Sequence, residues 1–208
     1  MFIGISGIIG VGKSTLTQKL ATHLGYKAYK EPVKDNPYLD DFYADMHRWG
    51  AMMQIHLLFR RFEQHQQIVW NADKGAVQDR TIYEDTIFAR MLHEGKFINE
   101  RDYATYLGHF NLMKRYLVYP DLLIYLRVDP KTSLQRISER GRKAEVGITL
   151  DYMEKLHEGY EEFIEEMNSY TQVLILDWNK FVSLDEVVGQ ISEKSVGRRN
   201  FLRDLAQQ

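Results

Sequence analysis

A glycine-rich stretch near the start of the chain is the first candidate for chemistry. Gly7, Gly12, Lys13 and Ser14 lie in "GIIGVGKST", spaced as G-x-x-x-x-G-K-[ST], directly after the apolar run "MFIGIS". Glycines let such a backbone curl so that its N–H groups point inward at phosphate oxygens. A helix starting near Lys13 adds the positive end of its dipole, the lysine reaches the β- and γ-phosphates, and the serine hydroxyl is a Mg²⁺ ligand. The stretch therefore predicts a nucleoside triphosphate site.

A carboxylate and an arginine follow two other apolar runs. In "YKEPV" the proline favours an extended Glu31 at the end of a strand, and "GAVQDR" ends another strand with Asp79 and Arg80. The carboxyl ends of parallel strands are where α/β sheets bind ligands. An arginine next to Asp79 favours phosphoryl transfer, in which developing negative charge has to be neutralised.

The pattern from residue 48 to 70 predicts a helix with one mixed face. Gln54 and Arg61 are seven residues apart, close to two helical turns, and Trp49, Met53 and Leu57 lie on or beside the same face. An amide, a guanidinium and apolar walls suit a planar heteroaromatic ligand. Taken alone, the same pattern also fits an amphipathic core helix with polar residues at its edge.

Three arginines gather in "RISERGRKAE". Arg136 and Arg140 are four residues apart on a predicted helix, and Arg142 follows Gly141. They predict a lid over about residues 136–147 that closes on the transferring phosphate. The alternative is a solvated basic helix end.

These residues have to be positioned by alternating strands and helices. Short apolar runs predict strands at residues 2–6, 27–30, 76–78, 121–128 and 172–177. Helical patterns cover residues 13–24, 48–70, 82–94, 100–118, 131–140 and 149–168, and a last helix starts at Leu184. Such alternation predicts an α/β fold: a five-stranded parallel sheet flanked by helices on both faces.

Composition narrows the class of protein. At 208 residues, 44% of them hydrophobic and 27% charged, the chain fits one globular domain spanning residues 1–208. A formal charge of −2 gives no reason to expect a nucleic-acid or membrane partner. The chain has no cysteine, which fits a reducing compartment, and no signal peptide or membrane span is evident. We expect a cytoplasmic protein.

Two other classes of phosphate-binding protein fit poorly. A GTPase switch needs D-x-x-G and N-K-x-D motifs, and the chain has neither of them. Motor and transporter ATPases end a hydrophobic strand with Asp or Asp-Glu, whereas Asp79 is followed by Arg80.

Five sequence blocks together resemble the deoxyribonucleoside kinases, most of all the bacterial deoxyadenosine/deoxycytidine kinase type. The blocks are "GIIGVGKST", "EPVKDNPYLDDFY", "RWGAMMQIHLLFRR", "VQDRTIYEDTIFA" and "RISERGRKAEVGI", in the family's order and spacing. The resemblance implies a P-loop kinase fold with an arginine-rich lid. It also implies transfer of phosphate from ATP, with Mg²⁺, to the 5′-hydroxyl of a 2′-deoxyribonucleoside, as in nucleotide salvage.

The resemblance also implies roles at the reaction centre. Glu31 would be the general base for the 5′-hydroxyl, and Arg80 would hold that hydroxyl and stabilise developing charge. Asp79 would help order Mg²⁺ and its water, together with Ser14. The donor ATP would be bound by Gly7, Gly10, Gly12, Lys13, Ser14, Thr15 and the lid arginines Arg136, Arg140 and Arg142.

The acceptor would be held by a second set of residues. Tyr43 and Glu145 would bind the sugar 3′-hydroxyl. The base would meet Gln54 at its edge and Phe88 on its face, with Arg61 and Asp85 as a charged pair beside it. Thr81 stands where the family commonly has Ser, and Met53 where it often has an aromatic residue.

Some alternatives stay open. A thymidylate kinase would also carry P-loop, Glu-Pro and Asp-Arg blocks, but in it Glu-Pro is followed by Gly-Gly-Thr, and the stretch "NPYLDDFY" is too acidic to favour an anionic acceptor. A non-catalytic nucleotide-binding module is the other alternative. The resemblance implies deoxyadenosine as the first substrate, deoxycytidine as the second and deoxyguanosine as the runner-up. The amide of Gln54 can present a donor and an acceptor to adenine or cytosine, and it can flip to read other bases. The family resemblance also implies a homodimer.

Overall fold

The computed structural model describes residues 1–32, 36–141, 145 and 147–205, with no account of the side chains of residue 72 and residues 195–205. Arg142 and part of the predicted lid lie outside the described residues.

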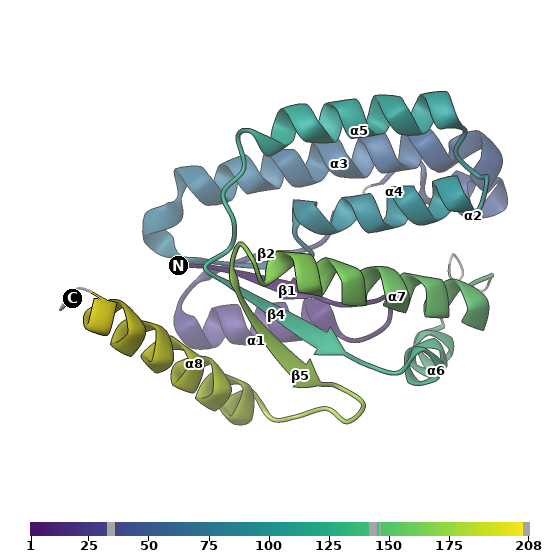
Figure 1. The fold of residues 1–208 in the computed structure, drawn as a ribbon. Helices are drawn as coiled ribbons and strands as arrows, with labels where there is room; N and C mark the ends of the chain where they lie inside the picture. Colours follow the sequence, from purple (N-terminus) through teal and green to yellow (C-terminus); the bar gives the residue numbers. More distant parts are fainter. Residues whose placement is uncertain (33–35, 142–144, 146, 206–208) are drawn as a thin grey trace.

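A five-stranded parallel sheet forms the centre of the molecule, as predicted (Figure 1). Its strands are β1 (Phe2–Ser6), β2 (Lys27–Tyr29), β3 (Ala76–Asp79), β4 (Leu122–Arg127) and β5 (Gln172–Asp177), in the spatial order β2-β3-β1-β4-β5. The central strands are buried on both faces and read as unbroken apolar runs, which explains why β1 and β4 were predictable.

The register brings the predicted chemistry to one edge of this sheet. Ile5 of β1 lies opposite Asp79 of β3, and Tyr29 of β2 lies opposite Gln78. Three neighbouring strands therefore end at the same side of the sheet. The glycine-rich loop follows β1, Glu31 follows β2 and Arg80 follows β3.

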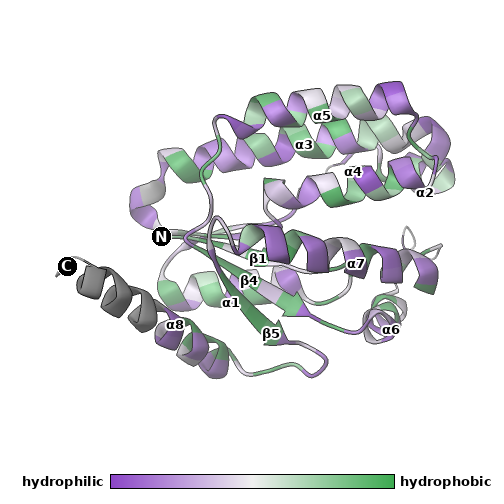
Figure 2. Cartoon of the chain, in the orientation of Figure 1, coloured by the Kyte–Doolittle hydropathy of each residue, from purple (hydrophilic) through white to green (hydrophobic). Residues whose placement is uncertain are grey.

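Helices cover both faces of the sheet. In the view of Figure 1, α1 (Lys13–Leu24) and α8 (Leu184–Leu205) lie below the sheet, and α3 (Met46–Trp70), α4 (Asp85–Glu94), α5 (Glu100–Lys114) and α7 (Leu150–Met167) lie above it. The strands and the inward sides of the helices are largely hydrophobic (Figure 2). The remaining helices are α2 (Leu39–Ala44), α6 (Pro130–Arg140) and the 3₁₀ turns η1 (Ala72–Lys74) and η2 (Ile82–Glu84).

Local capping chemistry sets several helix boundaries. Asp45 accepts a hydrogen bond from Arg48 N at the start of α3, and Thr149 does the same for Tyr152 N at the start of α7. Asp129 caps α6, whose first residue is Pro130, a favoured first helical residue.

The structure corrects two predicted helices. The helix predicted at 82–94 is divided into η2 and α4, because Thr81 and Glu84 form a capping box around a single 3₁₀ turn. The helix predicted at 100–118 ends at Lys114, and Val118 N beyond it donates to His65 on α3. Helix α2 was not predicted.

A second, smaller hydrophobic core lies between α2, α3 and α4. It contains Phe42, Met53, Leu57, Leu92 and Ile98, all at most 8% exposed. This core fixes α2 against α3 and so builds one wall of the cavity described next.

Candidate active site

A cavity of about 280 Å³ lies at the carboxyl edge of the sheet. It brings together most of the side chains that the sequence singled out. The predicted residues among those that line it are Gly10, Gly12, Lys13, Ser14, Thr15, Glu31, Tyr43, Gln54, Arg61, Arg80, Phe88, Arg140 and Glu145. A single space therefore joins the glycine-rich loop to the mixed face of α3.

The glycine-rich loop adopts the curled backbone that the motif predicts. Gly7, Gly10 and Gly12 have φ values of 146°, 86° and 97°, which L-residues with side chains rarely adopt. The Nζ of Lys13 donates to the carbonyl oxygens of Gly7 and Ile8, both at 2.8 Å. Burial, with Arg80 nearby, lowers the pKa of Lys13 to about 8.

Glu31 lies between two arginines. Its Oε1 accepts from Arg61 Nη2 at 2.7 Å and from Arg80 Nε at 2.9 Å. Burial alone would raise the pKa of this carboxyl, but the charges of Arg80, Arg61 and Lys13 outweigh it and lower the pKa to about 2. Glu31 is therefore an ionised carboxylate that lines the cavity and is held in place by hydrogen bonds from Arg61 and Arg80.

Arg80 is held in an unusual conformation. Its φ of 65° lies in the left-handed region, and its side chain is 2% exposed. The guanidinium lies 4.7 Å from the Phe88 ring centroid, and its Nη1 donates to the hydroxyl of Tyr160. Such a backbone costs about 1–3 kcal/mol and persists only where the surroundings fix it.

Buried polar atoms on the α3 wall of the cavity, and on Asp85 behind that wall, are not satisfied. Arg61 forms an ion pair with Asp85, and both side chains are almost fully buried. Among the described residues, Gln54 Oε1 and Asp85 Oδ2 have no hydrogen-bond donor, and Arg61 Nε has no acceptor. Unpaired buried polar groups cost about 1–3 kcal/mol each, so this wall of the cavity is prepared for a polar ligand.

Ser14 and Asp79 meet below the loop. The Ser14 hydroxyl hydrogen-bonds to Asp79 Oδ2, while Asp79 Oδ1 is buried and has no partner among the described residues. Burial raises the pKa of Asp79, with Glu31 adding to the effect. One hydroxyl and one orphaned carboxylate oxygen fit Mg²⁺, which uses few protein ligands and takes the rest from water and phosphate.

On the side of α6 and α7, Arg140 and Glu145 pair with each other. Arg140 Nη2 lies 2.7 and 2.6 Å from the two carboxylate oxygens of Glu145. Tyr43 faces them from α2, and burial together with the Glu145 charge raises its pKa to about 12. Tyr152 of α7 also lines the cavity, although no sequence motif marks this residue.

Comparisons with known proteins identify the family of this chain. The family model described as deoxynucleoside kinase matches residues 3–197. The chain is 44% identical to a deoxyadenosine kinase of Dictyostelium discoideum, over 91% of this chain and 77% of that protein. It is 41% identical to a deoxyadenosine/deoxycytidine kinase of Bacillus subtilis, over 91% of each chain.

Solved structures indicate the same family. A deoxyadenosine kinase from M. mycoides with bound dCTP superposes with a TM-score of 0.83 at 32% identity, covering 93% of this chain and all of that one. The chain belongs to the deoxynucleoside kinase family. Its P-loop kinase fold and its phosphotransferase class are those that the sequence predicted.

Some predicted residues of this deoxynucleoside kinase lie away from the cavity. Asp79 and Asp85 are reached through Ser14 and Arg61, and Arg142 lies outside the described residues. Arg136 is not among the described residues that line the cavity. Its Nη2 donates to the carbonyl oxygens of Trp178 and Asn179 at 2.9 Å.

The sequence missed the connection between β5 and α8, which lies beside the phosphate loop. The Phe181 ring lies 4.2 Å from the Arg136 guanidinium, and its Cε1 would be 3.5 Å from a Cβ at Gly12. No sequence motif marks this segment. It comes to lie beside the phosphate loop because of the order of the strands in the sheet, which local sequence patterns do not show. Among the helices in the described part of the chain, none is long and apolar enough to cross a membrane.

Proposed function

We propose that this deoxynucleoside kinase transfers the γ-phosphate of ATP to the 5′-hydroxyl of deoxyadenosine, and more slowly of deoxycytidine. The observation that carries the proposal is the position of Glu31. Its carboxylate faces one cavity that has a phosphate-binding loop at one end and unsatisfied base-pairing groups at the other.

Glu31 is suited to activate the acceptor hydroxyl. A neutral alcohol is a poor nucleophile, and a carboxylate within hydrogen-bond reach can accept its proton. The 5′-oxygen then bonds to the γ-phosphorus, the bond from that phosphorus to the ADP oxygen breaks, and the proton goes to Glu31. Because Glu31 is paired with Arg61 and Arg80 before substrate arrives, the hydroxyl has to replace part of this pairing.

Arg80 and Lys13 supply the fixed positive charge. Both are buried next to Glu31 and Asp79, where a charge acts more strongly than in water. Arg80 would hold the 5′-hydroxyl and stabilise the charge that develops during transfer. Lys13 would exchange its carbonyl contacts in the loop for the β- and γ-phosphates.

Ser14 and Asp79 are the residues that would hold Mg²⁺, Asp79 partly through water. A bound Mg²⁺ would supply positive charge that offsets the negative charge of the triphosphate. Gly7, Gly10, Gly12 and Thr15 would complete the triphosphate cradle.

Two of the three predicted lid arginines, Arg136 and Arg140, lie on α6. Arg140 already reaches the cavity, whereas Arg136 is held by the β5–α8 connection. We infer that Arg136, Arg140 and Arg142 turn toward the phosphates when the donor is bound.

Tyr43 and Glu145 would bind the 3′-hydroxyl of the sugar. Tyr43 is a phenol whose pKa is raised to about 12, so it remains a hydrogen-bond donor at neutral pH. Its ring lines the cavity and would crowd the sugar, which would favour a 2′-deoxyribose.

The α3 wall of the cavity favours a base that donates hydrogen bonds. Gln54 Oε1 lines the cavity and is a free acceptor, and an exocyclic amino group of adenine or cytosine is the complementary donor. Asp85, paired with Arg61 behind this wall, would form the charged pair beside the base. Phe88 would stack on the base. The M. mycoides deoxyadenosine kinase has been solved with dCTP and with dATP, in line with this preference. Deoxyguanosine is the third candidate, because guanine presents a carbonyl where adenine presents its amino group.

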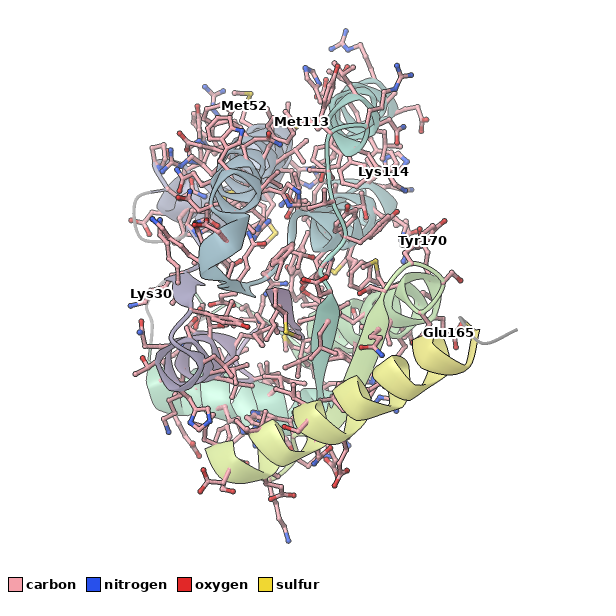
Figure 3. The ribbon with its side chains drawn as sticks, turned by 90° about the vertical axis from the view of Figure 1, so that its left-hand side faces the viewer. Lys30, Met52, Met113, Lys114, Glu165 and Tyr170 are labelled. Carbon is pink, nitrogen blue, oxygen red and sulfur yellow. The ribbon has the colours of Figure 1, made fainter. Side chains whose placement is uncertain are left out.

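We further propose a homodimer formed through α3 and α5. These two helices pack against each other, and their outward sides expose Met52 and Phe59 on α3 and Leu112 on α5, each at least 44% exposed. Tyr116, just after the end of α5, is 66% exposed. Met52 is seen at the outer surface of the helical layer in Figure 3. We place the enzyme in the cytoplasm, where its donor ATP is available.

Steady-state kinetics on a substrate panel test the proposed function. We expect kcat/KM with ATP and Mg²⁺ to be highest for deoxyadenosine, lower for deoxycytidine and lower again for deoxyguanosine, adenosine and cytidine. Thymidine monophosphate should not be phosphorylated. Preference for the monophosphate would show a thymidylate kinase instead, and no turnover with any acceptor would show a nucleotide-binding module.

A further inference from the structure

A tyrosine and a glutamate contact Arg80 from outside the cavity. The hydroxyl of Tyr160, on α7, accepts a hydrogen bond from Arg80 Nη1 and donates one to Glu84 Oε2 at 2.9 Å. Glu84 Oε2 also lies 3.7 Å from Arg80 Nη1. Both side chains are 0% exposed, and neither is among the described residues that line the cavity. They can therefore act on Arg80 without touching the substrate.

Glu84 also fixes the backbone that follows Arg80. Its Oε1 accepts from Thr81 N at 2.9 Å and from the Thr81 hydroxyl at 3.3 Å, which closes the capping box of η2. A single carboxylate thus holds the left-handed backbone at Arg80 through one oxygen. Through the other oxygen and Tyr160 it holds the guanidinium.

Tyr160 is itself rigidly placed. Its ring lies parallel to the Tyr125 ring at 6.1 Å between centroids, and edge-on to Phe88 and Phe163 at 6.3 Å. A hydroxyl on such a fixed ring offers Arg80 a hydrogen-bond acceptor at one defined point.

A second anchor is needed because Arg80 also bonds to Glu31. When the 5′-hydroxyl engages Glu31, the bond from Arg80 Nε to Glu31 is one of the contacts that has to change. If Glu31 were the only group that holds the Arg80 guanidinium, the guanidinium would lose its position when this hydrogen bond changes. We propose that Tyr160 and Glu84 are positioning residues that hold Arg80 in place while Glu31 exchanges Arg80 for the substrate hydroxyl. This inference rests on the proposed roles of Arg80 and Glu31.

The test is Tyr160→Phe, which removes only the hydroxyl. We expect kcat for deoxyadenosine to fall about tenfold, as for loss of a hydrogen bond to a charged group, while KM for ATP changes less than about twofold. The matched control is Tyr125→Phe. Tyr125 is also a fully buried tyrosine, but its hydroxyl bonds to Glu161 and not to Arg80, so kcat should stay at the wild-type value.

A double-mutant cycle separates positioning from a general loss of packing. In an Arg80→Met background, Tyr160→Phe should lower kcat no further, because the group that it positions is gone. Equal fold-losses in both backgrounds, or a folded Tyr160→Phe enzyme with wild-type kcat, would overturn the inference. Should Tyr160→Phe not fold, the same cycle with Glu84→Gln decides. Wild-type kcat in Arg80→Met itself would instead contradict the proposed function.

Discussion

At the scale of single residues, the site depends on how Glu31 is shared. Arg61 joins it to Asp85, behind the α3 wall of the cavity, and Arg80 joins it to Tyr160 and Glu84. Arg61 therefore contacts both the proposed general base and the carboxylate proposed to lie beside the nucleobase. A base bound next to Arg61 and Asp85 would be physically connected to Glu31 through this one guanidinium.

The low pKa of Glu31 has a consequence for pH dependence. A carboxyl whose pKa falls from about 4.5 to about 2 on folding stabilises the folded state fully above pH 4.5, and this contribution is lost as the pH falls toward 2. Protonation of Glu31 in the free enzyme therefore does not limit activity near neutral pH. The same pairing makes Glu31 a weak base until an arginine releases it.

Residues that line the cavity or hold a catalytic side chain, but belong to no motif, are the hardest to predict from the sequence. Glu31, Arg80 and Lys13 were selected because their sequence motifs have a known chemistry. Tyr152 and Tyr160 sit in an amphipathic helix, where an aromatic side chain normally signals core packing. Glu84 had a signal that could have been used: it stands three residues after Thr81, which is the spacing of a capping box.

At the scale of elements, His65 ties α3 to the connection between α5 and β4. Its Nε2 accepts from Val118 N at 3.0 Å, and its side chain is 0% exposed. Burial lowers the pKa of His65 from its usual 6.5 to about 4. The imidazole is therefore neutral in the folded enzyme at pH values where it would be charged in the unfolded chain.

This difference predicts an acid-sensitive stability. The unfolded chain binds a proton at His65 below about pH 6.5 and the folded chain only below about pH 4, so the contribution is complete above pH 6.5 and is lost as the pH falls toward 4. From pH 7 to pH 5 it amounts to about 2 kcal/mol of unfolding free energy. His65→Gln keeps a hydrogen-bonding group but does not titrate, so it should lose about 2 kcal/mol less than wild type over that range. Urea unfolding at both pH values measures this, and equal losses in the two proteins would show that His65 is not the group responsible.

Apolar strands and helices with a clear period are predictable from the sequence, and the short helix α2 is not. The strand at residues 2–6 was placed with its bounds, and the strands at 27–30 and 121–128 were too long by one and two residues respectively. Helix α2 is only six residues long, "LDDFYA", too short to show a helical period. It nevertheless carries Tyr43, which was identified through the family resemblance alone.

At the scale of the whole molecule, the cavity is assembled from distant segments. The loops after β1, β2 and β3 meet there because of the sheet order, and α2, α3, α4, α6 and α7 supply the walls. Neither the order β2-β3-β1-β4-β5 nor the pairing of Arg80 with Tyr160 can be read from local patterns. Both depend on long-range packing.

The proposed dimer makes a prediction at this scale. The chain has a mass of 24.6 kDa, so the wild type should sediment at about twice that mass. Phe59→Asp places a charge on the exposed side of α3 and should give a species of single-chain mass. Phe181→Asp, on the β5–α8 connection, changes an aromatic side chain of similar exposure and should stay dimeric. A monomeric wild type, or a dimeric Phe59→Asp variant, would refute this interface.

We propose that Glu31 takes the proton of the acceptor hydroxyl while the glycine-rich loop holds the donor ATP. Glu31→Gln keeps the size of the side chain and an oxygen for Arg61 and Arg80, but removes the basic carboxylate. We predict that kcat for deoxyadenosine falls at least about 100-fold, the usual range for losing a general base, while the Kd for ATP measured by calorimetry changes less than about threefold. A Glu31→Gln enzyme that turns over at the wild-type rate would contradict the account.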